Sequence, residues 1–164
     1  VPRKNIDGII KGFSRCKYKI NFQLVLNSYM DLDRYEDLCQ TLGIKDDVLF
    51  INSVSDEDLV ALFNGCHCFV FPSLYEGFGL PIIEAMNCGA PVLTSNISAC
   101  PEVAGDAAVL VDPNNPGDIS RGLDEICGNN TLRQTLIKRG FERAKQFSWD
   151  KFSNTMKKIY TGIK

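Results

Sequence analysis

The chain has 164 residues, of which 45% are hydrophobic and 23% are charged, as is typical of an ordinary globular domain. This length supports one sizeable core and is too short for two full domains. With 18 Lys and Arg residues against 20 Asp and Glu, the formal charge of −2 argues against a dedicated nucleic-acid binder. No apolar run approaches the roughly 20 residues that a membrane-spanning helix needs, so we expect no membrane span.

Seven cysteines are scattered along the chain, several of them in apolar stretches where a free thiol behaves as a small hydrophobic side chain. Cys66-His67-Cys68 has ligand-type residues, but no second pair stands at zinc spacing, so we expect no metal site. We interpret His67, the single histidine, as structural. Reduced cysteines favour a cytoplasmic location.

Helical and strand patterns alternate along the chain. Asn5 is expected to cap a first helix with Ile6, Ile9, Ile10 and Phe13 on one side, at helical spacing. Short apolar runs predict strands over residues 22–26, 48–51, 68–71, 91–93 and 107–111. Helices are expected over residues 31–42, which Gly43 ends, and after a cap at Ser55. A further helix is expected to begin at Pro81 and to end just before Gly89, followed by a short helical turn over 101–104 and by helices over most of 116–164.

This alternation predicts a single doubly wound α/β domain, with a parallel sheet covered by helices on both faces. A helical tail follows from about residue 116. The chain begins directly with a helical pattern and has no strand pattern ahead of it. We therefore expect the first strand of the domain to be missing, which would leave a gap or an unpaired edge within the sheet.

The segment from Phe71 to Met86 carries the strongest chemical signal. An expected strand leads into a loop with two glycines, and this loop leads into a helix whose first N–H groups are free to bind an anion. Glu76 precedes the glycines and Glu84 follows in the helix. Because a carboxylate is repelled by a diphosphate, we interpret both glutamates as acceptors for hydroxyl groups, one of a sugar and one of a ribose.

The stretch from Glu76 to Val92 resembles the Glu-x7-Glu signature of family 4 (group 1) retaining glycosyltransferases of the GT-B fold. Shorter matches occur in the family's order at Pro2–Asn5, at 53–59, at 101–108 and at 147–149. The resemblance implies that the chain is the C-terminal, Rossmann-like donor-binding half of a two-domain enzyme. Ser53 departs from the family pattern, which usually has glycine there.

By this resemblance, Lys4 would stabilise the departing nucleoside diphosphate and Glu76 would hold hydroxyl groups of the donor sugar. Val54 and Asp56 would contact the base, and Glu84 would hold the ribose. The remaining implied contacts to the sugar and phosphates come from the backbone of Gly77, Phe78, Gly79 and Leu80. No metal or other cofactor is implied.

The implied function is the transfer of a hexosyl group, with retention, from a nucleoside-diphosphate sugar to an acceptor hydroxyl. An acceptor glycan or glycolipid would bind to the missing N-terminal domain. Peripheral association with a membrane is also possible through that domain. The chain alone would show little or no activity. Two alternatives stay open: a non-catalytic nucleotide-sugar-binding module, or another GT-B enzyme such as a phosphorylase or an epimerase.

The sequence also suggests roles for three aromatic residues near these motifs. Tyr75 and Phe78 flank the glycine loop, where either a sugar pocket or core packing would explain them. Trp149 is expected to anchor the C-terminal helix by burial.

Overall fold

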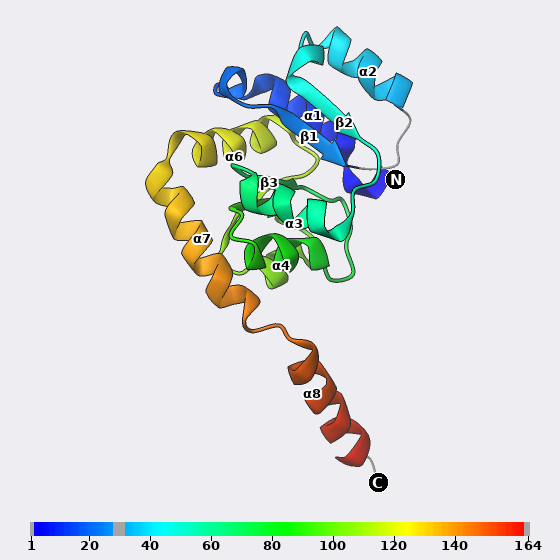
Figure 1. Ribbon diagram of the computed structural model, residues 1–164, viewed down its shortest axis with the longest axis vertical. Helices are drawn as coiled ribbons and strands as arrows, with labels where there is room; N and C mark the ends of the chain where they lie inside the picture. The colour runs from blue at the N-terminus through cyan, green and yellow to red at the C-terminus, as the bar shows by residue number, and fades with distance from the viewer. Residues whose placement is uncertain (1, 28–31, 163–164) are drawn as a thin grey trace.

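The computed structural model describes residues 2–27 and 32–162 (Figure 1). The expected start of the second helix at Asp31 lies outside these residues. The strands are β1 (Leu24–Asn27), β2 (Val48–Ile51), β3 (Phe69–Phe71), β4 (Val92–Ser95) and β5 (Ala108–Val111). The α-helices are α1 (Ile6–Arg15), α2 (Leu32–Thr41), α3 (Asp56–Gly65), α4 (Leu80–Asn87), α5 (Cys100–Ala104), α6 (Pro116–Gly128), α7 (Asn130–Ala144) and α8 (Trp149–Gly162). Three 3-10 turns, η1 (Pro2–Lys4), η2 (Lys19–Asn21) and η3 (Lys45–Asp47), complete the described elements.

All the strand pairs are parallel, as the alternation of strands and helices predicts. They form two sheets, however, with β1 paired to β2 and with β3, β4 and β5 in that order. Among the described residues, no strand pairing joins β1–β2 to β3–β4–β5. Apart from this break, the predicted α/β class is confirmed.

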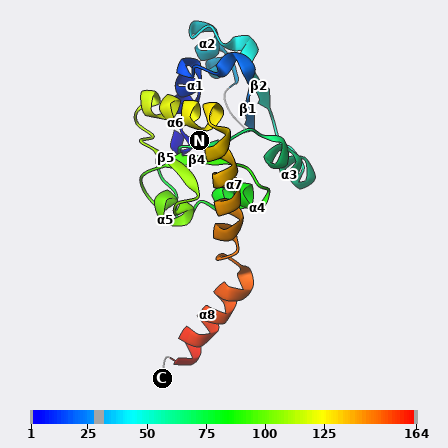
Figure 2. The ribbon, with the colours of Figure 1, turned by 90° about the vertical axis from the view of Figure 1, so that its left-hand side faces the viewer.

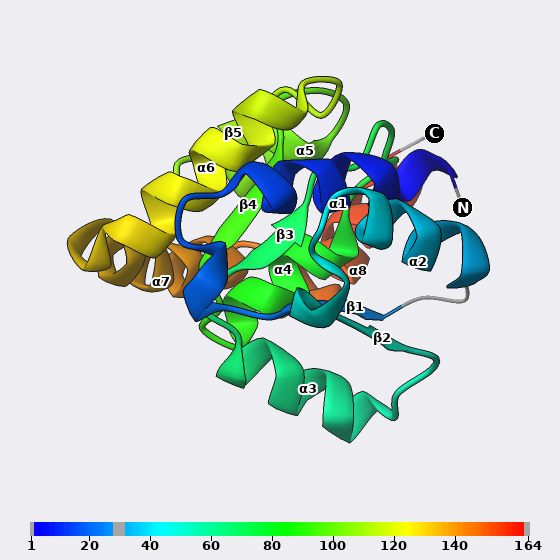
Figure 3. The same cartoon turned by 90° about the horizontal axis from the view of Figure 1, so that it is seen from above.

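Helices cover both faces of the sheets, because side chains of successive strand residues point to opposite faces. On one face, Leu93 of β4 packs into a core with α1 and α6, and Leu24 and Val48 of the smaller sheet join the same core. On the other face, Val92 packs into a second core with α4 and α5. Figure 3 shows the two faces from above, with α1 and α6 side by side on one of them.

Close helix contacts explain two of the glycines in the sequence. A Cβ on Gly122 of α6 would lie 2.7 Å from Leu93 Cδ1, so glycine lets this helix approach the sheet. A Cβ on Gly12 of α1 would lie 2.5 Å from Ile119 Cγ2 of α6. These contacts hold α1, and with it the preceding residues Arg3 and Lys4, against the body of the domain.

The helix ends follow the sequence closely, with one correction at Asn5. Gly43 and Gly89 end α2 and α4 with φ of 67° and 74°, a left-handed conformation that favours glycine. Ser55 caps α3 by accepting a hydrogen bond from Asp58 N–H at 3.1 Å. Asn5 lies at the start of α1 but has φ of 58° and makes no side-chain cap, so the expected capping role is wrong.

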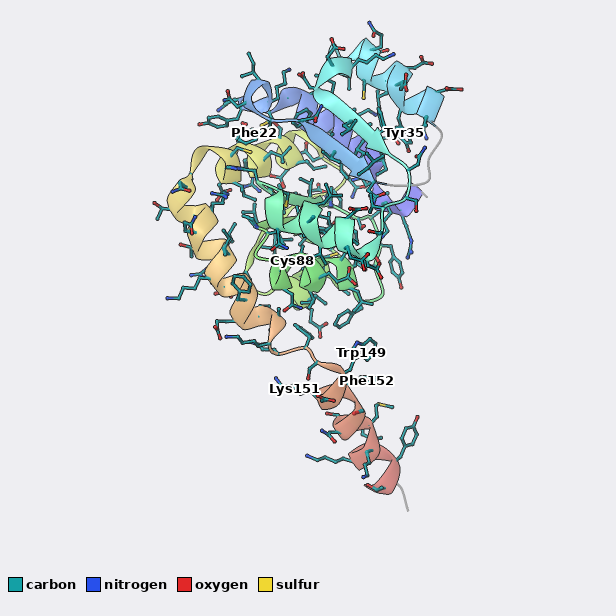
Figure 4. All side chains as sticks on the ribbon, in the orientation of Figure 1. Phe22, Tyr35, Cys88, Trp149, Lys151 and Phe152 are labelled. Atoms are coloured by element: carbon teal, nitrogen blue, oxygen red, sulfur yellow. The ribbon has the colours of Figure 1, made fainter. Side chains whose placement is uncertain are left out.

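The last helix, α8, extends away from the body of the domain (Figures 1 and 2). Trp149 at its start is 76% exposed, and Phe152, which its ring contacts edge-on, is 58% exposed. Figure 4 shows both rings at the end of α8 nearer the domain, outside the two cores. The expectation that Trp149 anchors this helix by burial is therefore wrong, because α8 has no buried residue among those described.

Candidate functional site

The centre of the site is an ion pair between Lys4 and Glu76, which lie 72 positions apart in the chain. Lys4 Nζ donates to Glu76 Oε1 at 2.8 Å, and the Glu76 side chain is only 8% exposed. The same ammonium lies 4.3 Å from the centre of the Phe71 ring, a distance that suits a cation–π contact. The structure thus brings together the two residues for which the sequence predicts a catalytic role.

Asn5 explains why Lys4 lies where it does. The amide Nδ2 of Asn5 donates to Pro72 O at 3.0 Å and to Pro113 O at 2.7 Å, so it joins the start of α1 to the loops that follow β3 and β5. Arg3 O adds a further tie, because it accepts a hydrogen bond from Leu74 N–H at 2.8 Å. These three bonds fix the backbone on both sides of Lys4 beside the carboxyl end of β3.

The loop after Glu76 presents backbone donors at the beginning of α4. Within residues 2–27 and 32–162, the N–H groups of residues 77–80 have no hydrogen-bond partner. Such unpaired donors, together with the positive end of the helix dipole, favour an anion at this position. Since Lys4 lies beside the same loop, the site combines an ammonium group with a cluster of free amides.

The backbone conformation explains the presence of glycine at one of the two glycine positions of the loop but not at the other. Gly79 has φ of 98°, which favours glycine in the fold itself. Gly77 has no such φ, and a Cβ added there would meet no atom within 4 Å. Nothing in the described fold therefore requires glycine at position 77, whereas a ligand that approaches the backbone there would.

The other predicted site residues have no hydrogen bond or ion pair with Glu76 among the described contacts. Glu84 is exposed on α4, one turn beyond Leu80. Val54 is partly buried and Asp56 is exposed, at the loop between β2 and the start of α3. These positions follow the carboxyl end of β2, which belongs to the smaller sheet.

The structure also settles how the loop aromatics pack. Tyr75 is 67% exposed, so core packing does not explain it. Phe78 is 41% exposed, and its ring meets Phe147 edge-on at 5.5 Å between centroids. Both rings remain available at the surface beside the glycine loop.

Two residues of this site were missed by the sequence interpretation. Arg3 Nη1 lies 3.9 Å from Glu76 Oε2, which places a second cation beside the carboxylate. Ser98 Oγ accepts a hydrogen bond from Glu76 N–H at 3.0 Å and donates to Glu76 O at 2.6 Å. Arg3 could have been noticed as a neighbour of Lys4, but no sequence signal distinguishes Ser98 from other serines in loops.

Burial shifts the pKa values of two further titratable side chains, Cys100 and His67. Burial raises the pKa of the Cys100 thiol, and the Glu76 carboxylate adds to this shift, so Cys100 stays a neutral thiol. Burial, with help from Arg133, lowers the pKa of His67, whose ring packs 4.5 Å from that of Phe22. Among the described residues, no group of three or more His, Cys, Asp or Glu side chains could hold a metal ion.

Comparison with known proteins identifies the family of this chain. A model of the family described as glycosyl transferases group 1 matches residues 1–143. The chain belongs to this family. The O-antigen chain mannosyltransferase B of Escherichia coli is 38% identical over 91% of this chain and 40% of that protein. The MMP alpha-(1->4)-mannosyltransferase of Mycolicibacterium hassiacum is 32% identical over 98% of this chain and 40% of its own length.

Solved glycosyltransferase structures support the same family and fold. Sucrose-phosphate synthase from Thermosynechococcus elongatus superimposes with a TM-score of 0.86 and 27% identity, over 99% of this chain and 43% of that one. The chain spans about 40% of the length of the curated relatives named above.

No described helix is both long and apolar enough to cross a membrane.

Proposed function

We propose that this chain is the donor-binding part of a retaining glycosyltransferase and that it binds a nucleoside-diphosphate sugar. The observation that carries the proposal is the meeting of Lys4, Glu76 and the free N–H groups of residues 77–80 at one helix start. A diphosphate sugar has an anionic part and a neutral part rich in hydroxyl groups. The site has separate groups that suit each of them.

The diphosphate would lie against the start of α4 and the Lys4 ammonium. When the bond to the sugar breaks, negative charge grows on the leaving phosphate, and groups already held in place stabilise it most effectively. The anion would compete with Glu76 for Lys4 Nζ. Arg3, with Nη1 at 3.9 Å from Glu76, would then remain as a cation beside the carboxylate.

The sugar would lie against Glu76, Gly77 and Phe78. A carboxylate beside bound phosphates is repelled by them but accepts hydrogen bonds strongly from sugar hydroxyl groups. The open space over Gly77 gives the sugar or a phosphate close access to the backbone. The N–H groups of Gly79 and Leu80 complete this part of the proposed site.

The nucleoside would extend from the phosphates toward Glu84 and the segment that carries Val54 and Asp56. Exposed Glu84 would accept hydrogen bonds from the ribose hydroxyls, and Val54 and Asp56 would contact the base. The curated relatives named above are mannosyltransferases by name, so a mannosyl donor is the first candidate for the sugar. The site as proposed uses no metal and no other cofactor.

The transfer itself would need groups beyond these 164 residues. The acceptor, a glycan or a glycolipid, would bind to a further N-terminal domain, and the donor phosphate would help to take the acceptor proton. Catalysis by this chain would then consist of positioning and leaving-group stabilisation by Lys4 and Glu76. A cytoplasmic location fits a sugar-nucleotide donor and stays a prediction.

The direct test is calorimetric titration of the chain with GDP-mannose, UDP-glucose and ADP-glucose. We expect weak binding of at least one of them, with a Kd in roughly the micromolar to low millimolar range, because this chain spans only 40% of the length of the relatives named above. A folded chain that binds none of the three at millimolar concentration would contradict the proposal.

A sharper test uses the glycine that the fold does not require. Gly77→Ala is expected to leave the melting temperature unchanged and to weaken donor binding about tenfold or more, because the added methyl group occupies the approach to the backbone. Gly65→Ala is the matched control, since a Cβ at Gly65 also meets no atom within 4 Å. Equal affinity of the Gly77→Ala and Gly65→Ala variants would rule out a ligand at this loop.

The ribose role is tested separately. Glu84→Ala is expected to weaken both the sugar nucleotide and the free nucleoside diphosphate, by about tenfold each, because both contain the ribose. Glu84 is exposed, so the fold should not suffer. Unchanged affinity for both ligands would eliminate this role while leaving the phosphate site standing.

A further inference from the structure

Three hydroxyl side chains on one segment bond to three backbone carbonyls on another, at the carboxyl ends of β3 and β4. Thr94 Oγ1 donates to Phe71 O at 2.8 Å, Ser95 Oγ donates to Ser73 O, and Ser98 Oγ donates to Glu76 O at 2.6 Å. We call Thr94, Ser95 and Ser98 the hydroxyl ladder. It continues the pairing of β3 with β4 beyond the end of the strand, as far as Glu76.

The three members of the hydroxyl ladder differ in what they hold. Thr94 and Ser95 are fully buried and each donates to a carbonyl within or just after β3. Ser98 alone binds both peptide groups of one residue, because it also accepts from Glu76 N–H at 3.0 Å. Ser98 therefore fixes the backbone from which the Glu76 carboxylate extends.

The segment that carries Ser98 is itself anchored. Asn96 N–H donates to Val111 O of β5 at 2.8 Å, and Ala99 O accepts from Val103 N–H at 3.0 Å in the first turn of α5. Ser98 has φ of 60°, a conformation that L-residues seldom adopt. Its hydroxyl is thus presented from a defined backbone position rather than from a free loop.

We propose that Ser98 is a positioning residue, which holds Glu76 in the orientation that receives the donor sugar. This inference rests on the proposed function and adds to it a residue that does not touch the donor. Lys4 and the N–H groups of residues 77–80 reach the phosphates without Ser98. Loss of the Ser98 hydroxyl should therefore affect recognition of the sugar more than recognition of the nucleoside diphosphate.

The test compares GDP with GDP-mannose, and UDP with UDP-glucose, in calorimetric titrations of the 164-residue chain and its variants. In Ser98→Gly, we expect affinity for the sugar nucleotide to fall about tenfold while affinity for the diphosphate changes less than about twofold. Ser98→Ala should show the same split, which makes the result independent of any relief of the positive φ.

Two controls separate positioning from a general effect on the fold. Ser53→Gly makes the same backbone change at a residue with φ of 58° that lies outside the hydroxyl ladder, in the loop proposed to contact the base. Because both ligands contain the base, this variant should leave the ratio of the two affinities unchanged. Thr94→Val removes a ladder bond at Phe71 and should lower the melting temperature without altering the ratio of the two affinities. If the ratio of the affinities for the sugar nucleotide and for the diphosphate is unchanged in Ser98→Gly, whether neither affinity falls or both fall equally, the inference is overturned.

A second measurement distinguishes this inference from the proposed function. Hydrogen exchange of the Glu76 amide in the ligand-free chain should become at least about tenfold faster in Ser98→Gly and stay unchanged in Ser53→Gly. If the wild-type chain binds no nucleotide, the proposed function fails and the donor role of Ser98 fails with it. If nucleotides bind but Glu76 exchange is insensitive to Ser98, only the positioning role is overturned.

Discussion

The loops after β2 and after β3 both carry residues proposed to bind the donor, yet they are held very differently. The β3–α4 loop, residues 72–79, is tied to the start of α1 by Asn5, to the end of β4 by Ser95 and to the β4–α5 segment by Ser98. The β2–α3 loop, residues 52–55, is exposed for most of its length, and its described hydrogen bonds are the local ones at the Ser55 cap.

This difference matters for binding. A preorganised group loses little entropy when the ligand arrives, whereas a loosely held loop is ordered at the expense of binding free energy. The phosphate and sugar end of the proposed site is therefore built in advance, and the base end, at Val54 and Asp56, is held by local structure alone. Substitutions in the first loop should cost more folding stability than equivalent substitutions in the second.

The largest expected effect is at Asn5. Asn5→Ala removes two hydrogen bonds to carbonyls and places alanine at φ of 58°, so we expect the free energy of unfolding to fall by about 2–4 kcal/mol. Asn52→Ala, in the exposed β2–α3 loop, is the matched control and should change stability by less than about 0.5 kcal/mol. Urea denaturation of both variants measures the difference, and similar values would contradict the comparison.

The ion pair gives the next effect. Lys4→Met keeps the length and the apolar stem of the side chain but leaves Glu76, which is 8% exposed, with only the longer 3.9 Å contact to Arg3. We expect a loss of about 1–2 kcal/mol, less than for a fully buried pair, because Lys4 is 31% exposed. In the double variant Lys4→Met/Glu76→Gln, much of this loss should be recovered. A double variant no more stable than Lys4→Met would show that the unpaired charge is not the cause.

In the β2–α3 loop, the largest single contribution should be the helix cap. Ser55→Ala removes the hydrogen bond to Asp58 N–H and should cost about 1 kcal/mol, whereas Ser55→Asp should retain most of the stability. Thermal unfolding of the three proteins is sufficient for this test. A loss as large as that of Asn5→Ala would mean that this loop is held more firmly than its contacts indicate.

Much of the fold could be predicted because it depends on local patterns. Apolar runs located all five described strands to within two residues at each end, and Gly43 and Gly89 marked the ends of their helices. The Glu76 loop could also be found, since two glycines before a helix form a local pattern. In each case the physical cause lies within a few residues of the effect.

The features that could not be predicted depend on distant parts of the chain. Asparagine is a residue type that often caps helices, but the side-chain amide of Asn5 donates hydrogen bonds to Pro72 O and Pro113 O, which lie 67 and 108 positions away. Ser98 binds Glu76 across 22 positions. Trp149 is a large aromatic residue of the kind that is often buried, but burial requires a neighbouring surface to pack against. Trp149 remains largely exposed because α8 extends away from both cores.

The smallest expected effect compares the two loops at equal backbone conformation. Ser53 in the β2–α3 loop has φ of 58°, and Ser98 beside the β3–α4 loop has φ of 60°. Ser53→Gly relieves the unfavourable conformation and breaks no hydrogen bond that the structure describes, so we expect a gain of about 0.5 kcal/mol after the added flexibility of the unfolded chain is counted. Ser98→Gly gains the same relief but loses two hydrogen bonds to Glu76, so its net effect should be a loss of about 1 kcal/mol. Opposite signs in urea denaturation would show that contacts, rather than backbone conformation, separate the two loops; equal signs would remove the distinction.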